Sequence, residues 1–146
     1  MEQTSVNPFQ AILEKFSKRI VERFEKSEKR LYVLIESRDL LEVVAYVFRD
    51  LDARYIIVTG LDTPKGIELV YHFAFDRQDK VASIRTIIAH EKPEIESITG
   101  IIKGASWIER EIREILGVTF LNHPDPRPFL MAEDWPEGVF PLRNMK

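Results

Sequence analysis

The last part of the chain, residues 117–146, constrains the fold most, because it combines many prolines with many large apolar side chains. It holds five of the chain's eight prolines: Pro124, Pro126, Pro128, Pro136 and Pro141. Proline lacks the backbone N–H and favours extended chain, which excludes a long helix or a central strand here. The segment is also too apolar for a disordered tail, which is typically polar and strongly charged. We therefore predict an extended tail that lies on another surface, either its own domain or a second protein.

The composition is that of a soluble globular protein. With 146 residues, of which 45% are apolar and 31% charged, the chain is long enough for one domain with a core. A net charge of −3 and a pI of about 5.7 argue against binding to nucleic acid or anionic lipid. No apolar run approaches the roughly 18 residues of a membrane span. The N-terminus lacks the basic start and apolar stretch of a signal peptide, which predicts a cytoplasmic protein. Abundant Glu, Arg and Lys with scarce Asn and Gln indicate a thermophilic source.

Apolar residues recur at helical spacing from Phe9 to Phe24, which predicts one helix from a cap at Asn7 to about Glu25. Further periodic segments predict a strand over Leu31–Ile35, a helix over Asp39–Arg49, and strands over Tyr55–Thr59, Ile67–Phe75 and Val81–Ala89. This α-β-α-β-β-β order predicts an α+β fold, a two-layer sandwich with the helices on one face of a mostly antiparallel sheet. A short helix and the extended C-terminal tail follow. We divide the chain into an α+β domain over residues 1–116 and a docking tail over residues 117–146.

The short helix before the tail is rich in charge. Ser106 and Glu109 have the spacing of a capping box, and Gly117 is placed to end the helix after Leu116. Glu109 stands four residues before Arg113, so the two side chains face each other on a helix. This interleaving of carboxylates and arginines favours a structural or docking role for the helix.

Residues that could perform chemistry are few. The absence of cysteine excludes disulfides, thiolate nucleophiles and Cys-ligated clusters in this chain. His72, His90 and His123 are far apart, without the spacing of metal ligands, and no glycine-rich phosphate loop is present. A small enzyme is the alternative, and its acid–base groups would be Glu109, Glu111, Glu114 and His123. We predict no catalytic, cofactor-binding or metal-binding residue.

A resemblance to a known family is carried by four segments: Ala105–Val118, Asn122–Asp125, Asp134–Trp135 and Pro141–Arg143. They resemble the 30-kDa subunit family of respiratory complex I, which includes related subunits of membrane-bound, energy-converting nickel–iron hydrogenases. The family pattern is A-x-W-x-E-R-E-x-x-D-hydrophobic-x-G, then G-H-P-D, D-W and P-L-R-K. Direct matches in the helix are Trp107, Glu109, Arg110, Glu111 and Gly117. Glu114 replaces the usual Asp, Asn122 the usual Gly, and Asn144 the usual Lys.

The resemblance implies a subunit without a redox centre, which supports assembly of the hydrophilic arm of a membrane-bound oxidoreductase. Such a subunit is peripheral, on the cytoplasmic side of the cell membrane. Its implied partners are a large subunit of the 49-kDa or hydrogenase type and a small iron–sulfur subunit. Iron–sulfur clusters, and a nickel–iron centre where there is one, would lie in these partners. The family motif gives these docking residues: Trp107, Glu109, Arg110, Glu111, Glu114, His123, Pro124, Phe129, Trp135, Leu142 and Arg143.

Length and composition are used to predict the type of complex to which such a subunit would belong. The chain ends soon after its PLRN motif, and this compactness favours a hydrogenase-type or ferredoxin-linked complex over a quinone-reducing NADH dehydrogenase (complex I), in which the chain would be the 30-kDa subunit. The alternative from another class is a stand-alone soluble binding module whose tail packs on its own body.

Overall fold

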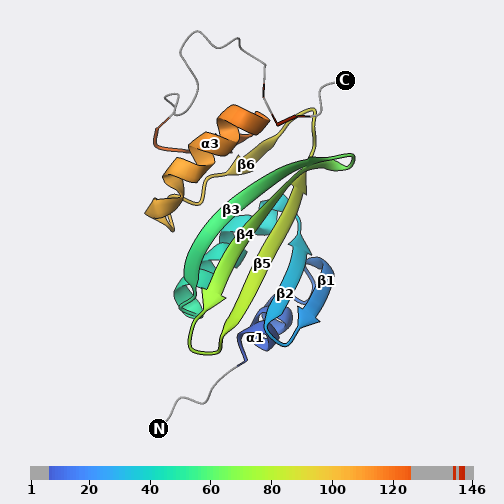
Figure 1. Cartoon of the computed structure of the whole chain (residues 1–146), viewed down its shortest axis with the longest axis vertical. Coiled ribbons are helices and arrows are strands. Elements are labelled where there is room, and N and C mark those ends of the chain that lie inside the picture. The colour runs from blue at the N-terminus through green and yellow to red at the C-terminus, as the bar shows by residue number, and fades with distance from the viewer. Residues whose placement is uncertain (1–6, 126–139, 141, 144–146) are drawn as a thin grey trace.

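The computed structural model describes residues 7–125, 140 and 142–143 (Figure 1). Its elements follow one another in this order: α1 (Pro8–Lys15), β1 (Ile20–Ser27), β2 (Arg30–Ile35), η1 (Ser37–Asp39), α2 (Leu40–Ala45), η2 (Tyr46–Asp50), β3 (Arg54–Thr63), β4 (Gly66–Phe75), β5 (Lys80–Ile88), β6 (Glu94–Glu96), η3 (Lys103–Ala105), α3 (Ser106–Leu116) and β7 (Thr119–Leu121). Here η1 and η3 are 3-10 turns, and η2 is a π-helical turn that continues α2.

The main sheet has five strands in the order β1-β2-β5-β4-β3. All its neighbouring strands are antiparallel except β2 and β5, which are parallel. Parallel neighbours need a long crossover connection, and here that connection contains α2 and the β3–β4 hairpin. A separate two-stranded parallel sheet joins β6 to β7.

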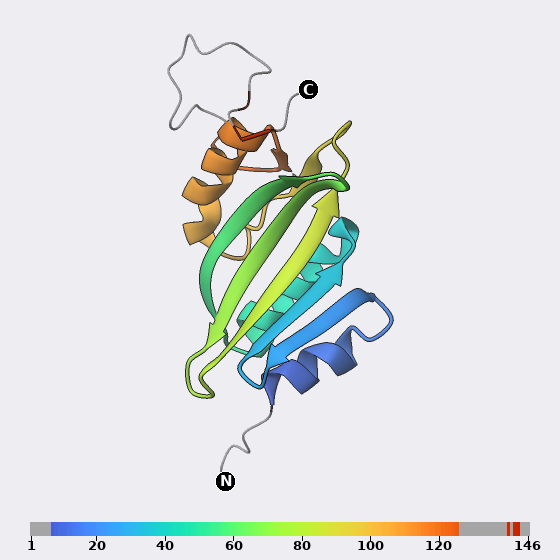
Figure 2. The ribbon, with the colours of Figure 1, turned by 45° about the vertical axis from the view of Figure 1, so that its right-hand side comes forward.

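The core lies between the main sheet and its helices, which cover one face (Figures 1 and 2). Alternate residues of β4, such as Leu69, Tyr71 and Phe73, are fully buried, as expected for a strand whose side chains point to the two faces in turn. The ring of Phe16 after α1 meets the ring of Tyr46 after α2 edge to face at 5.5 Å, so both helices lie on the same side. The predicted α+β class, with helices over a mostly antiparallel sheet, is confirmed.

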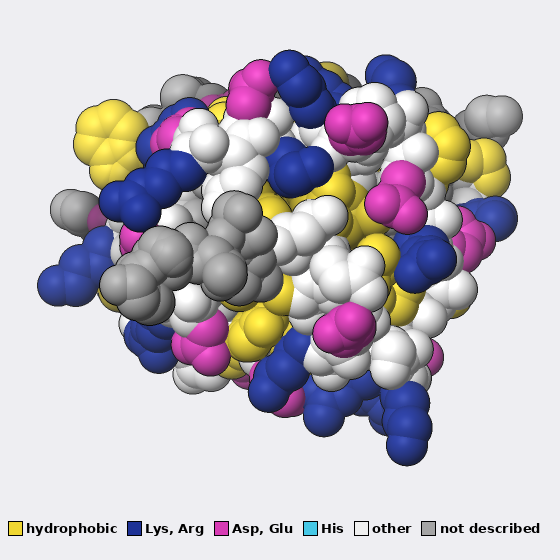
Figure 3. All heavy atoms as spheres, turned by 90° about the horizontal axis from the view of Figure 1, so that it is seen from below, with side chains coloured by type: hydrophobic (Ala, Val, Ile, Leu, Met, Phe, Trp, Pro, Cys, Tyr) yellow, Lys and Arg dark blue, Asp and Glu magenta, His cyan; other side chains and the backbone are white. Residues whose placement is uncertain are grey.

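The opposite face of the sheet is polar at its centre. Arg85 on β5 donates to Glu68 on β4 at 2.6 Å, and the ring of His72 lies between the hydroxyls of Ser83 (2.9 Å) and Thr59 (3.2 Å). Burial, and after it the charge of Arg30, lowers the pKa of His72. At the end of the molecule where α1 lies, Lys and Arg alternate with Asp and Glu around smaller hydrophobic areas (Figure 3).

The prediction of one long helix to Glu25 is wrong. Helix α1 begins at its Asn7 cap as predicted, but it ends at Lys15, and Ile20–Ser27 forms the edge strand β1. Phe24 does not join a buried helical stripe; it is 58% exposed and stacks on Tyr32 of β2. Cross-strand pairing with β2 decides the structure of this segment, and an edge strand buries too little to show a clear alternation in sequence.

The other predicted elements are present with shifted ends. Strand β3 runs to Thr63, beyond the predicted Thr59, because its pairing with β4 continues to a turn at Pro64–Lys65. There the hydroxyl of Thr63 donates to the carbonyl of Gly66 at 2.6 Å and closes the hairpin. The predicted helix over Asp39–Arg49 consists of α2 with the turns η1 and η2 at its ends.

Candidate subunit-docking site

Helix α3 places the motif residues that the sequence singles out. It packs along β3, where Leu116 and Ile112 face Gly60 (Figure 2). Gly117 ends the helix in the left-handed conformation, with φ +77°, and its N–H donates to the carbonyl of Arg113 at 3.0 Å. Glycine adopts this conformation without steric cost, so the predicted C-terminal stop is confirmed.

The predicted capping box is wrong. The turn η3 leads directly into α3, so Ala105 occupies the cap position with helical backbone angles and has no side-chain cap. Ser106 is therefore already inside the helix, and the carboxyl of Glu109 turns away from the helix start. It forms hydrogen bonds with the segment after β6 instead.

Glu109 is the central side chain of this region and is fully buried. One carboxyl oxygen lies 2.6 Å from the hydroxyl of Ser97, and the other accepts the N–H of Ile98 at 2.9 Å. Burial raises the pKa of Glu109 to about 7, although both hydrogen bonds act in the opposite direction. Glu109 thus fixes α3 to the turn that follows β6.

His123 holds the start of the tail on the same helix. Its Nδ1 accepts the N–H of Asp125 at 3.0 Å, which leaves the proton of the neutral ring on Nε2. Nε2 then donates to the carbonyl of Ser106 at 3.1 Å and lies 3.8 Å from the carboxylate of Glu109. Arg110 forms an ion pair with Asp125 at 3.3 Å.

Strand β7 joins the end of α3 to His123 and attaches this segment to β6. It pairs with β6, and two bonds extend the pairing: the N–H of Thr119 donates to Pro93 at 2.8 Å, and that of Ser97 to Leu121 at 2.9 Å. A cavity of about 260 Å³ opens between α3 and β7, lined by Glu109, Arg110, Arg113, Phe120, Leu121 and His123 among others. The tail is therefore joined to the folded body from its first residues.

The described part of the C-terminal end also contacts α3. The N–H of Leu142 donates to the carbonyl of Ile115 at 2.9 Å, and Nη1 of Arg143 donates to the carbonyl of Leu116 at 3.0 Å. Nε of Arg143 lies 3.8 Å from the carboxylate of Asp62 on β3. The last turn of α3 thus receives two hydrogen bonds from the C-terminal end of the same chain, while the side chain of Leu142 is 57% exposed.

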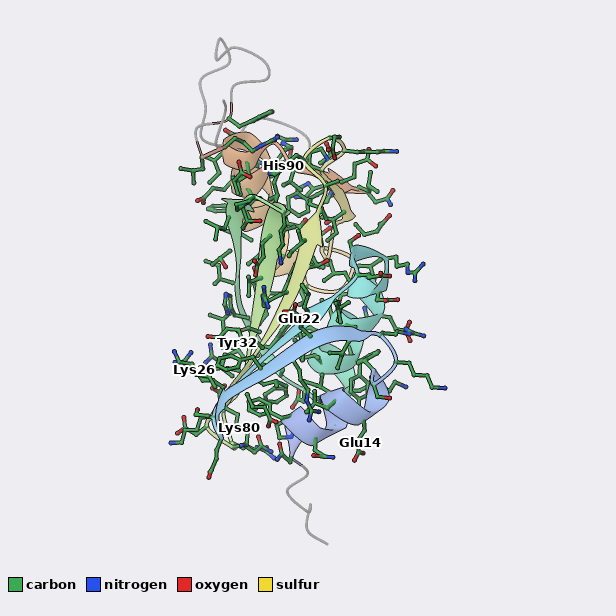
Figure 4. The ribbon with its side chains drawn as sticks, turned by 90° about the vertical axis from the view of Figure 1, so that its right-hand side faces the viewer. Glu14, Glu22, Lys26, Tyr32, Lys80 and His90 are labelled. Carbon is green, nitrogen blue, oxygen red and sulfur yellow. The ribbon has the colours of Figure 1, made fainter. Side chains whose placement is uncertain are left out.

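Asp62 is a residue that the sequence did not reveal. Its side chain is nearly buried at the end of the sheet, and Nε2 of His90 lies 2.6 Å from its carboxylate; Figure 4 shows His90 at the same end of the molecule as α3. The contacts of Asp62 come from the segment after β5 and from the C-terminal end, so no local pattern in the sequence could have indicated them. Ser97 was missed for the same reason.

The remaining residues of the predicted docking set differ in exposure. Trp107 is 68% exposed, whereas the side chains of Glu111 and Glu114 are partly buried and Pro124 is exposed. Phe129 and Trp135 lie outside the described residues. Glu111 follows Glu109 by two residues and so points about 200° away from it around the helix. Of the acid–base groups of the enzyme alternative, Glu109 and His123 come together, but Glu111 points elsewhere. Among the described residues, no three His, Asp or Glu side chains are grouped so that they could hold a metal ion.

Comparison with known proteins identifies the family. The model of the respiratory-chain NADH dehydrogenase 30 Kd subunit matches residues 33–146, which include the whole of α3 and the tail. The chain belongs to this family. The resemblance carried by the Trp107–Arg143 motif is therefore confirmed.

Relatives of this 30-kDa-type chain come from several oxidoreductase complexes. The C subunit of the F(420)H(2) dehydrogenase of Methanosarcina mazei is 32% identical over 133 residues, covering 89% of this chain and 84% of that protein. Formate hydrogenlyase subunit 5 of Escherichia coli is 28% identical over 92% of this chain, which spans only 24% of that longer protein. A chain of the archaeal membrane-bound sulfane sulfur reductase has the same fold, with a TM-score of 0.77, 23% identity, and coverage of 92% of this chain and 81% of that one. No helix in the described parts is long and apolar enough to cross a membrane.

Proposed function

We propose that this chain is a non-catalytic assembly subunit in the hydrophilic arm of a membrane-bound oxidoreductase complex, where it docks on the large subunit. The complex is of the energy-converting nickel–iron hydrogenase type or a related ferredoxin-linked type. The observation that carries the proposal is the exposure of Trp107, 68%, on a family-motif helix whose other side is fixed to its own domain. Membership of the 30-kDa family supports the subunit role.

Trp107 has the properties of an interface anchor. Exposed tryptophan is costly to leave in water and is enriched among residues that dominate binding energy. Helix α3 is held at both ends, by Glu109 and by Arg143, so the indole is presented by a rigid element. Loss of such an anchor typically costs about 2 kcal/mol or more, which corresponds to roughly 30-fold in affinity.

The partners in this proposal are the large subunit and the small iron–sulfur subunit. They hold the iron–sulfur clusters and, in a hydrogenase-type complex, the nickel–iron centre. This chain has no cysteine and so offers no thiolate to a cluster. The protein lies on the cytoplasmic side of the membrane, bound through its partners.

The docking test compares two exposed aromatic residues. Tagged wild-type chain, Trp107→Ala and Phe24→Ala are purified from the native host, and the yield of the large subunit is measured. Phe24 is a matched control because it is 58% exposed but lies on β1, at the opposite edge of the sheet from β3 and α3. We expect Trp107→Ala to lose most of the large subunit and Phe24→Ala to retain it. Normal recovery with Trp107→Ala would refute docking through α3.

The type of complex is tested by metal content. A hydrogenase-type partner carries nickel, so we expect about one nickel per co-purified large subunit, measured by mass spectrometry of the metals. A large subunit without nickel would exclude the hydrogenase type and leave a ferredoxin-linked relative or the second candidate, the 30-kDa subunit of a quinone-reducing NADH dehydrogenase, which the family description supports. The electron donor would then be identified by oxidation assays on the intact complex.

A further inference from the structure

The hydrogen bonds around Glu109 tie this fully buried carboxyl of α3 to the turn that follows β6. The hydroxyl of Ser97 donates to an ionised carboxyl of Glu109 at 2.6 Å, whereas a protonated carboxyl would donate to Oγ of Ser97 instead; Oγ of Ser97 also lies 2.7 Å from Oγ1 of Thr99. The N–H of Thr99 returns to Oγ of Ser97 at 3.1 Å, and the N–H of Ile98 is accepted by the second carboxyl oxygen. These contacts can form with the carboxyl charged or neutral, so its burial and the charges around it decide which form is held.

A negative charge at the same position has one candidate ion-pair partner among the described residues, the imidazole of His123. Nε2 of His123 lies 3.8 Å from the carboxylate of Glu109. Its two ring nitrogens already form hydrogen bonds, Nδ1 with the N–H of Asp125 and Nε2 with the carbonyl of Ser106. A second ring proton would occupy Nδ1 and break the bond from the N–H of Asp125. The neutral ring therefore fits this arrangement, and with a neutral ring the described residues give an ionised Glu109 no counter-ion in contact.

Titratable and charged groups near Glu109 come from α3, the start of the tail and the main sheet. On α3 and at the tail they are Arg110, Arg113 and His123, with Asp125 beyond Arg110, and from the sheet they are Tyr55 and Tyr71. Arg110 is engaged with Asp125. Tyr71 is fully buried, and burial with the nearby Glu109 raises its pKa well above the usual value, so it stays neutral. The phenol of Tyr55 likewise stays neutral, its pKa raised to about 12.

We propose that Glu109 is a proton-controlled latch between the docking helix α3 and the β6–β7 layer. With the proton bound, the carboxyl closes the network with Ser97 and Ile98 and holds the layer against the helix. When the proton leaves to solvent, the buried carboxylate is stabilised by water, so the contact with the turn Ser97–Ile102 opens more often. The start of the tail moves with this layer, because its strand β7 is paired with β6.

The size of the effect follows from proton linkage. The latch binds its proton with a pKa of about 7 when closed, against the ordinary value of 4.5 when open to water. Linkage then predicts that opening becomes about 30-fold more frequent between pH 5.5 and 8.5, and that most of this change is complete by pH 7.5. This is a gain in flexibility at the docking helix around neutral pH.

The experiment is amide hydrogen exchange with NMR on the full-length chain, corrected for the intrinsic pH dependence of exchange. We expect the protection of the Ile98 amide to fall about 30-fold from pH 5.5 to 8.5, with the Glu109 carboxyl carbon titrating near pH 7. Glu109→Gln keeps the shape and an acceptor for Ile98, so its protection should be independent of pH. Glu111→Gln, on the other side of the same helix, should behave as wild type.

Two results would overturn the latch. One is a Glu109 carboxyl that titrates below pH 5, measured on the wild-type chain alone and so independent of whether a variant folds. The other is a pH dependence of Ile98 protection that persists in Glu109→Gln. Neither result bears on the Trp107 docking test, which measures recovery of the large subunit.

Discussion

The contact between Gly117 and Phe140 tests whether the C-terminal end is part of the folded domain. Gly117 has φ +77° and ψ 21°, and a methyl group on its Cα would lie 2.6, 2.7 and 2.9 Å from three carbons of the Phe140 ring. Carbon atoms do not approach so closely, so Gly117→Ala must displace the ring. The ring centre lies 5.8 Å from the guanidinium carbon of Arg143, and Leu142 and Arg143 bind the last turn of α3.

The cost of Gly117→Ala has two parts. The left-handed conformation costs an ordinary residue about 1–2 kcal/mol. Phe140 is partly buried, and because full burial of such a side chain contributes about 1.5–3 kcal/mol, its displacement should cost about 1 kcal/mol. We therefore expect Gly117→Ala to reduce the free energy of unfolding by about 2–3 kcal/mol and Phe140→Ala to reduce it by about 1 kcal/mol.

The double variant distinguishes the two parts. Once the ring is absent, alanine at position 117 has only the backbone cost, so the double variant should be no less stable than Gly117→Ala alone. The coupling free energy is then about 1 kcal/mol. Gly117→Asn separates the backbone cost from the displacement of the ring. Asparagine tolerates the left-handed conformation better than alanine but carries the same Cβ, so it should lose mainly the contribution of the ring.

The assay is equilibrium urea unfolding followed by far-UV circular dichroism, with the slope compared among variants. Gly100→Ala is the control for replacing glycine, since a methyl group there would meet no atom within 4 Å and its φ is ordinary. Strict additivity of Gly117→Ala and Phe140→Ala would refute the reasoning, because it would mean that the ring does not rest on Gly117 in solution.

Three further predictions concern stability. The pKa of Glu109 is raised above its unfolded value of 4.5 to about 7, so the free energy of unfolding should fall by up to about 3 kcal/mol as pH rises from 4.5 to 8. Urea unfolding at several pH values measures this fall, and Glu109→Gln should remove it. Gly66→Ala should cost at least about 2 kcal/mol by thermal melting, since its methyl group would overlap the carbonyl oxygen of Ile88, whereas Gly104→Ala meets open space and should cost far less. Tyr71→Phe should be neutral or stabilising by up to about 1 kcal/mol, because the buried hydroxyl has no hydrogen-bond partner among the described residues; a loss of about 2 kcal/mol in urea unfolding would reveal a hidden partner.

What the sequence predicted well depends on short-range chemistry. The cap at Asn7 acts on the N–H of Phe9 two residues away, and Gly117 ends α3 through a bond to Arg113. The alternation in β4 is clear because that strand is central and one of its faces is wholly in the core. Each of these signals is complete within a few residues.

What the sequence did not predict depends on chain segments that meet only after folding. The β1 segment has apolar residues at helical spacing, but pairing with β2 overrides this pattern. Asp62 is held at the end of the sheet by His90 and faces Arg143, which no local spacing indicates. Ser97 likewise contacts Glu109, which lies 12 residues further along the chain with η3 between them.

The motif residues of helix α3 do not all have the same role. Trp107 and Glu109 stand two residues apart, so their side chains point about 200° apart around α3. One is 68% exposed and the other fully buried, so in this structure the indole is open to a partner and the carboxyl faces its own domain. The carboxyl of Glu109 fixes the helix to its own domain, and that fixation determines where the indole of Trp107 is presented. A substitution at Glu109 should consequently weaken docking by misplacing the helix, and restoring the hydrogen bond to Ile98 with Gln should rescue docking without restoring the charge.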